Sequence, residues 1–188
     1  MKNLIWLASY PKSGNTWLRV FLTNLLSKSD KPSSINQLYP LYWANDNSLI
    51  EKYSLFEASE LNAIELDEIR QEVYLKYAKS LKEEAFLKTH HASFILNQEN
   101  SFINSAITKG VVYLVRNPFD VAISLAHHQE ITVDKAIRFM NNDQAYLGTP
   151  NNNQNTGAEF VSSWSKNYLS YKQNHVPTLI VKYEDLVL

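Results

Sequence analysis

The sequence LIWLASYPKSGNTWLRVFLTNLL, at residues 4–26, contains the clearest indication of how this chain folds. It opens with a short apolar run, Leu4–Ala8, which has the length of a buried strand. Pro11 and Gly14 then mark residues 9–15 as a turn. From residue 16 to residue 26 the apolar side chains recur at the spacing of one helical face, at Trp17, Leu18, Phe21, Leu22, Leu25 and Leu26. A strand, a tight loop and a helix in this order aim backbone N–H groups and a helix N-terminus at an anion.

The loop itself carries side chains that suit a phosphate group. Lys12 supplies a positive charge, and Ser13 and Thr16 supply hydroxyl groups. An ordinary strand-to-helix connection in an α/β domain explains the same composition, because Lys, Ser and Gly are common in turns. The loop is not a Walker A motif, since Lys12 precedes Gly14 instead of following a second glycine.

The string YPKSGNTW, at residues 10–17, closely resembles the 5′-phosphosulfate-binding loop YPKSGTTW of sulfotransferases that use 3′-phosphoadenosine 5′-phosphosulfate (PAPS). The one difference is Asn15, where that family has threonine. Asparagine is a good helix N-cap, so we expect Asn15 to cap the helix and to leave the backbone donors in place. The resemblance implies that the loop binds the 5′-phosphosulfate and that Trp17 stacks on adenine, although plain core packing also explains Trp17. The loop residues to which it assigns cofactor contacts are Lys12, Ser13, Gly14, Asn15 and Thr16.

Composition sets broad limits on the function. The chain has 188 residues, 45% of them hydrophobic and 20% charged, which fits one globular domain spanning residues 1–188. The net charge of −1 gives no indication of a nucleic-acid partner. The absence of cysteine excludes disulfides, thiolate nucleophiles and cysteine–zinc sites. The apolar run at the N-terminus is too short for a signal peptide or a membrane span, so we expect a cytoplasmic protein with no membrane partner.

A second short strand is predicted at residues 85–90, AFLKTH, and it ends in polar residues. Functional groups of parallel sheets gather at the carboxyl ends of strands, where Lys88 and His90 would lie on one side. A lone histidine there is either structural or a base that works near neutral pH. KTH also resembles the family's KTHLP-type motif, which implies that His90 is the catalytic base and Lys88 its electrostatic partner. The chain departs from that motif at His91 and Ala92, where the family often has Leu-Pro.

A third strand is predicted at residues 111–115, followed by Arg116-Asn117-Pro118 and a helix over residues 119–128. Arg116 could simply end the strand or pair with a carboxylate. The segment YLVRNPFDVAISLAHH, however, strongly resembles the family's 3′-phosphate-binding segment YVARNPKDVAVSYYHF. The resemblance implies that Arg116 and Ser124 bind the 3′-phosphate, and the planar fork of arginine suits that role.

The remaining segments are less distinctive. Helices are predicted over residues 58–84 (one or two), 132–140 and 158–173, and a fourth strand over residues 178–182. TLIVKYEDL, at residues 178–186, resembles the family's LYLFYEDM-type segment, which implies that Tyr183 contacts the cofactor; a tyrosine that anchors a strand end is the alternative. The aromatic residues of 39–56 either wall a pocket or pin a loop onto the core. The asparagine-rich segment 141–157 is predicted to be a lid near the acceptor pocket.

Together these patterns predict a three-layer α/β/α fold with a central parallel sheet of four core strands, at residues 4–8, 85–89, 111–115 and 178–182. The resemblance adds a P-loop-like sulfotransferase fold and an enzyme that moves a sulfuryl group from PAPS to a small-molecule alcohol, phenol, sugar or amine. PAP (the desulfated product) is released, and no metal is required. Lys12, Lys88 and His90 are the expected catalytic residues, and a homo-oligomer is left open.

The sequence leaves two other functions open. The chain stops at Leu188, after the last predicted strand, whereas the family continues with an Arg-Lys-Gly stretch that grips the 3′-phosphate. A PAP- or PAPS-binding module without turnover is therefore the main alternative. A P-loop kinase is disfavoured, because Arg116 stands where an acidic strand end would hold Mg²⁺.

Overall fold

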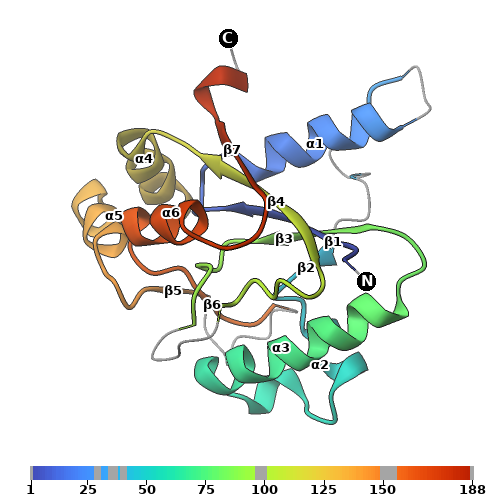
Figure 1. Cartoon of the computed structure of the whole chain (residues 1–188). Coiled ribbons are helices and arrows are strands. Elements are labelled where there is room, and N and C mark those ends of the chain that lie inside the picture. The colour runs from blue at the N-terminus through green and yellow to red at the C-terminus, as the bar shows by residue number, and fades with distance from the viewer. Residues whose placement is uncertain are drawn as a thin grey trace.

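The computed structural model describes residues 2–27, 31–33, 38, 42–95, 101–148 and 156–186. In these ranges a parallel sheet lies between helices, with α1 on one face and α2 and α3 on the other (Figure 1). This arrangement confirms the predicted α/β/α fold class. No helix among the described residues is long and apolar enough to cross a membrane.

The sheet has five parallel strands in the order β2-β3-β1-β4-β7. β1 (Leu4–Ser9) lies at the centre, between β3 (Ala85–Thr89) and β4 (Thr108–Val115). β7 (Thr178–Lys182) pairs with β4, and β2 (Tyr42–Trp43) pairs with β3. Because all strands are parallel, their carboxyl ends meet at one edge of the sheet, which is where α/β proteins place ligands.

Two details of the sheet correct the prediction of four strands. β2 has only two residues, so it forms no hydrophobic period that the sequence could reveal, and it exists through its pairing with β3. β4 begins at Thr108, three residues earlier than predicted, because Thr108–Gly110 still pair with the start of β1.

The predicted helices form, with two corrections. α1 (Asn15–Leu26), α4 (Pro118–His128) and α5 (Val133–Met140) lie close to their predicted bounds. α3 (Ala63–Ser80) starts five residues later than the predicted 58, because Asn62 and Glu65 form a capping box and a short 3₁₀ turn, η2 (Ala58–Glu60), precedes it. It also ends four residues before the predicted 84, because the backbone becomes extended at the C-cap residue Leu81.

The helix predicted over residues 158–173 is wrong in its first third. Residues Glu159–Phe160 form β6, which pairs antiparallel with β5 (Tyr146–Leu147). Ser162 has a positive φ of 57°, which no helix tolerates, and Ser163 then caps α6 (Trp164–Lys172). The apolar spacing there reflects burial of Phe160 and Val161 outside the helix.

Segment 27–56 contains one helix that the sequence did not indicate. α2 (Asn47–Tyr53) is only seven residues long, and the Asp46 side chain caps it by accepting a hydrogen bond from the Ser48 backbone. Part of the predicted lid, residues 149–155, lies outside the described residues, as does Tyr39. A short 3₁₀ turn, η3 (Glu184–Leu186), follows β7.

The core lies mainly on the face of the sheet that α2 and α3 cover. Trp6 of β1 is fully buried there, with Tyr74 at 5.3 Å and Phe102 at 5.6 Å between ring centres. On the other face, Leu18 of α1 packs with Leu7 and Leu114. This packing holds β1 rigidly between two layers, so the loop that follows it has a fixed base.

Candidate active site

A cavity of about 1020 Å³ opens at the carboxyl edge of the sheet. It lies where β1, β3 and β4 end, and the structure brings most of the predicted site residues together in it. Those that line the cavity are Lys12, Gly14, Asn15, Thr16, Trp17, Lys88, His90, Arg116 and Ser124; Ser13 and Tyr183 do not line it. Trp17 is 37% exposed, which contradicts its alternative reading as a core residue.

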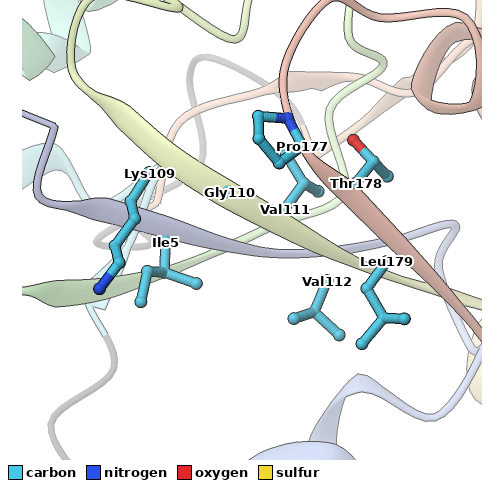
Figure 2. Close-up of a pocket in the computed structure, with 8 residues that line it drawn as sticks. All are labelled: Ile5, Lys109, Gly110, Val111, Val112, Pro177, Thr178 and Leu179. Atoms are coloured by element: carbon cyan, nitrogen blue, oxygen red, sulfur yellow. The ribbon is translucent and has the colours of Figure 1, made fainter.

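A second hollow, of about 420 Å³, lies toward the opposite ends of the strands (Figure 2). Val112 and Leu179 lie side by side on the sheet surface there. Lys109 is the charged residue in its lining, and its ammonium group pairs with Glu84. With no converging polar groups among its lining residues, this hollow is a poor candidate for a site of chemistry.

The backbone of the loop after β1 forms a concave turn. Lys12 has a φ of 68° and Gly14 a φ of 98°, both in the left-handed region. Turns of this kind point successive N–H groups to one side and form anion-binding nests. Gly14 also occupies the N-cap position of α1, and no side chain caps the helix, so its first-turn N–H groups are open to an anion.

The expectation that Asn15 caps α1 is wrong. Asn15 is the first helical residue, one position past the N-cap, and its side chain is buried. Its Nδ2 donates to the carbonyl oxygen of Leu7 at 3.0 Å and to Ser9 Oγ at 3.2 Å. The side chain therefore ties the loop to β1 and leaves the helix N-terminus without a side-chain cap.

Arg116 links the loops that follow β1 and β4. Its Nη1 donates to the carbonyl oxygen of Lys12 at 3.3 Å, and its guanidinium lies 4.5 Å from the ring centre of Tyr183. Tyr183 in turn packs against Gly14, so closely that a Cβ at position 14 would lie 2.3 Å from the ring. Tyr183 thus packs against both the loop and Arg116, and it does not line the cavity.

His90 is held in one tautomer by its surroundings. Its Nδ1 lies 2.8 Å from the carbonyl oxygen of Ser9, which can only accept, so Nδ1 carries the proton and Nε2 keeps a free electron pair. Burial, reinforced by the charge of Lys88, lowers the pKa of His90 to about 4. His90 is therefore neutral at pH 7, as a general base must be.

Glu159, which the sequence did not single out, organises the end of β3. It is 2% exposed, and its Oε1 accepts hydrogen bonds from Thr89 Oγ1 at 2.9 Å and from the His90 backbone N–H at 2.8 Å. Its Oε2 lies 3.8 Å from Lys88 Nζ. Burial alone would raise the pKa of Glu159. The interactions with Lys88, with the His90 side chain and with the His90 backbone N–H outweigh burial and lower the pKa to about 2.

Lys88 is a buried cation with two partners. It is 6% exposed, and its ammonium group lies 4.5 Å from the ring centre of Trp43 as well as near Glu159. Burial lowers its pKa, and the charge of Glu159 opposes that shift. Of the aromatic residues at 42–56 that could have walled a pocket, Trp43 lines this cavity.

A buried ionic cluster that no pattern in the sequence indicated lies next to Glu159. Arg70 donates to Asp67 at 2.7 Å, and His91 Nε2 lies 3.1 Å from the same carboxylate oxygen. His91 is fully buried, while His90 lines the cavity, so the two histidines point apart, although β3 ends at Thr89 and both lie beyond the strand. Among the described residues no three potential ligands gather in a way that could hold a metal ion.

Comparison with known proteins places this geometry in a family. A family profile described as "Sulfotransferase domain" matches residues 2–188. The chain is 24% identical over 192 aligned residues to luciferin sulfotransferase of Photinus pyralis, covering 97% of this chain and 46% of that protein. It is 28% identical over 142 residues to cytosolic sulfotransferase 14 of Arabidopsis thaliana, covering 74% of this chain and 36% of that protein. The chain thus spans less than half the length of these two relatives.

Solved structures show the same fold. Retinol dehydratase in a complex with retinol and PAP superposes with a TM-score of 0.56 at 18% identity, over 100% of this chain and 56% of that one. Retinol dehydratase with androsterone and PAP gives a TM-score of 0.51 at 18% identity, over 98% and 55%. The family profile spans nearly the whole sequence, including the loop after β1, the end of β3 and the Arg116 segment, and the chain therefore belongs to the sulfotransferase domain family.

Proposed function

We propose that this chain transfers a sulfuryl group from PAPS to a hydroxyl or amine of a small-molecule acceptor. The observation that carries the proposal is one cavity that holds both an uncapped anion-binding loop with Lys12 after β1 and a neutral His90 after the neighbouring strand β3. Family membership and the PAP in the two superposed structures support the choice of donor.

The donor would lie across the loop toward β4. The open N–H groups at the start of α1 and Lys12 would hold the 5′-phosphosulfate, and Arg116 with Ser124 would hold the 3′-phosphate. Arg116 suits this role because its Nε is buried without a hydrogen-bond partner in the described structure, so the guanidinium has a donor still to be satisfied. The backbone N–H of Ser13 already donates to the Tyr10 carbonyl oxygen at 3.2 Å, so Ser13 would contribute by holding the shape of the loop. Trp17, exposed at the cavity wall, would stack on adenine.

The transfer would need no covalent intermediate. His90 Nε2 would take the proton of the acceptor as its oxygen or nitrogen attacks sulfur, and the bond from sulfur to the PAP phosphate oxygen would break. Lys12 and the loop N–H groups would stabilise the negative charge on that leaving oxygen, and Lys88 would face the charge of the sulfuryl oxygens. Glu159 would keep Lys88 protonated for this purpose. Tyr183 would act through Gly14 and Arg116 instead of touching the donor.

The acceptor and the cellular setting stay predictions. The superposed structures contain retinol and androsterone, so a small molecule is the expected acceptor class. A cytoplasmic location and association with a second copy are expectations that carry over from the sequence. A PAP-binding module without turnover is the competing function, because the relatives extend well beyond the matched region.

Two measurements on the 188-residue chain separate these functions. Calorimetric titration with PAP, with ADP as the control for the 3′-phosphate, should show binding that is selective for PAP. Turnover of PAPS with a panel of phenols and alcohols should then release PAP. Selective PAP binding without turnover would support the binding module, and absence of PAP binding would refute both.

A further inference from the structure

The cavity extends beyond the space that the proposed donor would fill. Along the carboxyl edge of the sheet, the strand order places Arg116 after β4, the loop with Lys12 after β1, and Lys88 with His90 at the end of β3. β2 lies beyond β3 and contributes Trp43. At about 1020 Å³ the cavity lies at the upper end of the range for small-molecule sites, so it has room for two ligands.

In-line displacement decides which ligand lies on which side. The attacking and leaving atoms lie on opposite sides of the sulfur, as they do in phosphoryl transfer. If PAP leaves toward Lys12 and Arg116, the acceptor must approach from the β2–β3 side, past His90. The wall around Trp43 is then the acceptor wall.

That wall carries two cations that share one ring. The guanidinium of Arg19, one turn into α1, lies 5.8 Å from the ring centre of Trp43, and the ammonium group of Lys88 lies 4.5 Å from it. Trp43 is 40% exposed, so part of its ring remains accessible to a ligand. Two like charges beside one ring repel each other, and the charge of Arg19 contributes to lowering the pKa of Lys88.

The positive charge of this wall is only partly balanced. Glu159 is the acidic residue in the cavity lining. Its oxygens already accept hydrogen bonds from Thr89 and His90 and pair with Lys88. Among the described residues Arg19 has no carboxylate within ion-pair distance, and its Nε is buried without a hydrogen-bond partner. A buried, unpaired guanidinium nitrogen is costly unless a ligand satisfies it.

We propose that Arg19 and Trp43 form an acceptor subsite for a ring-bearing hydroxy acid, in which Arg19 pairs with the acid group while the ring stacks on Trp43. The inference rests on the proposed function, which fixes the side from which the acceptor enters. Arginine suits the task because its fork binds a carboxylate in two parallel hydrogen bonds. Lys88 then remains available to the sulfuryl group, and Arg19 selects among acceptors.

The test compares two phenols that differ in one charge. Para-hydroxyphenylacetate and its neutral amide, para-hydroxyphenylacetamide, are titrated into the 188-residue chain by calorimetry, with and without saturating PAP. We expect the acid to bind at least about tenfold more tightly than the amide, as a charge-assisted hydrogen bond provides. Arg19→Met should remove this preference and leave PAP affinity unchanged, and Arg19→Lys should restore part of it. Arg138→Met, which removes an exposed arginine on α5, is the matched control and should keep the full preference.

The outcomes distinguish the two hypotheses. Equal binding of acid and amide, binding of neither, or a preference that survives Arg19→Met would each overturn the acceptor subsite. A loss of PAP affinity in Arg19→Met would also overturn it, because Arg19 would then serve the donor. Failure of the wild-type chain to bind PAP would refute the proposed function instead, and the titrations without PAP would still decide the subsite.

Discussion

Replacing Gly14 by alanine should be among the most damaging single-methyl changes in this chain. The backbone at Gly14 has a φ of 98°, and holding an L-residue in the left-handed region costs about 1–2 kcal/mol. The new Cβ would lie 2.3 and 2.6 Å from two ring carbons of Tyr183, and overpacking of this kind costs about 1–3 kcal/mol. The two costs predict a loss of about 2–5 kcal/mol, which is a large part of the stability of a typical domain.

Gly110→Ala is the matched control for this change. Gly110 lies in β4 without a positive φ, and a Cβ there would meet only the Pro177 carbonyl oxygen at 3.4 Å. Alanine loses less conformational entropy than glycine on folding, so we expect a change within about 1 kcal/mol. Urea unfolding monitored by tryptophan fluorescence gives the free energy of unfolding of both variants.

A double mutant separates the two costs at Gly14. Tyr183→Ala removes the ring that the new methyl group would strike but leaves the backbone strain. Relative to Tyr183→Ala alone, adding Gly14→Ala should then cost only about 1–2 kcal/mol. Equal stability of Gly14→Ala and Gly110→Ala, or strictly additive effects in the double mutant, would refute the close contact between Gly14 and Tyr183.

Three further predictions concern the proposed site. Arg116→Ala should weaken PAP binding about 10–100-fold, but adenosine 5′-phosphosulfate binding far less, because only PAP carries the 3′-phosphate; equal weakening of both in calorimetry would contradict the assigned role. His90→Ala should abolish turnover and leave PAP affinity near wild type. In the wild-type enzyme, kcat/KM should fall toward acid with a midpoint near pH 4, where His90 becomes protonated, and not near the ordinary histidine pKa of 6.5. A midpoint near 6.5, or an unchanged rate in the variant, would remove His90 as the base. Glu159→Gln should lower the free energy of unfolding by about 3 kcal/mol, because it leaves Lys88 buried without a counter-charge. Adding Lys88→Met should recover much of this loss. A double mutant whose loss of stability equals the sum of the two single-mutant losses would refute the pairing.

The pH dependence of stability follows from the same two groups. The pKa of His90 is lower in the folded chain than in the unfolded one, so between about pH 6.5 and pH 4 the unfolded state binds more protons and stability falls as the pH drops. The pKa of Glu159 is also lowered, from 4.5 to about 2. Its stabilising contribution is therefore fully present above pH 4.5 and is lost progressively as the pH falls from 4.5 toward 2. Urea midpoints measured in both windows should therefore decline toward acid, and His90→Ala should flatten only the upper window.

Local signals in the sequence predicted the parts of the site that local structure creates. The loop after β1, the polar end of β3 and Arg116 after β4 each follow a short apolar run, and parallel pairing of those runs brings them to one edge. Features that depend on distant contacts left no such signal. Asn15 anchors the loop because the Leu7 carbonyl is near, and a sequence pattern cannot distinguish that role from capping.

Glu159 shows the same limit more sharply. Its position looks like part of a helix, because Phe160 and Val161 continue an apolar spacing toward Trp164 and Tyr168. Only the pairing of β6 with β5, and the turn at Ser162, carry the carboxylate to the end of β3. Arg19 is similarly hidden, since a single arginine beside an apolar helical stripe is read most simply as a solvated residue.

The role of Glu159 follows from a conflict that the proposed chemistry creates. The site needs a charged lysine and a neutral histidine close together, and burial pushes both toward neutrality. Lys88 raises the cost of protonating His90, which serves the base, while Glu159 acts on both groups in the opposite direction. On His90 that influence is outweighed by burial and by Lys88, so the imidazole stays neutral. On Lys88 the same carboxylate is the leading contribution that opposes burial. One buried carboxylate thus favours the charged form of the lysine without turning the base into an acid, and we propose Glu159 as a positioning residue beside His90 and Lys88 in the transfer.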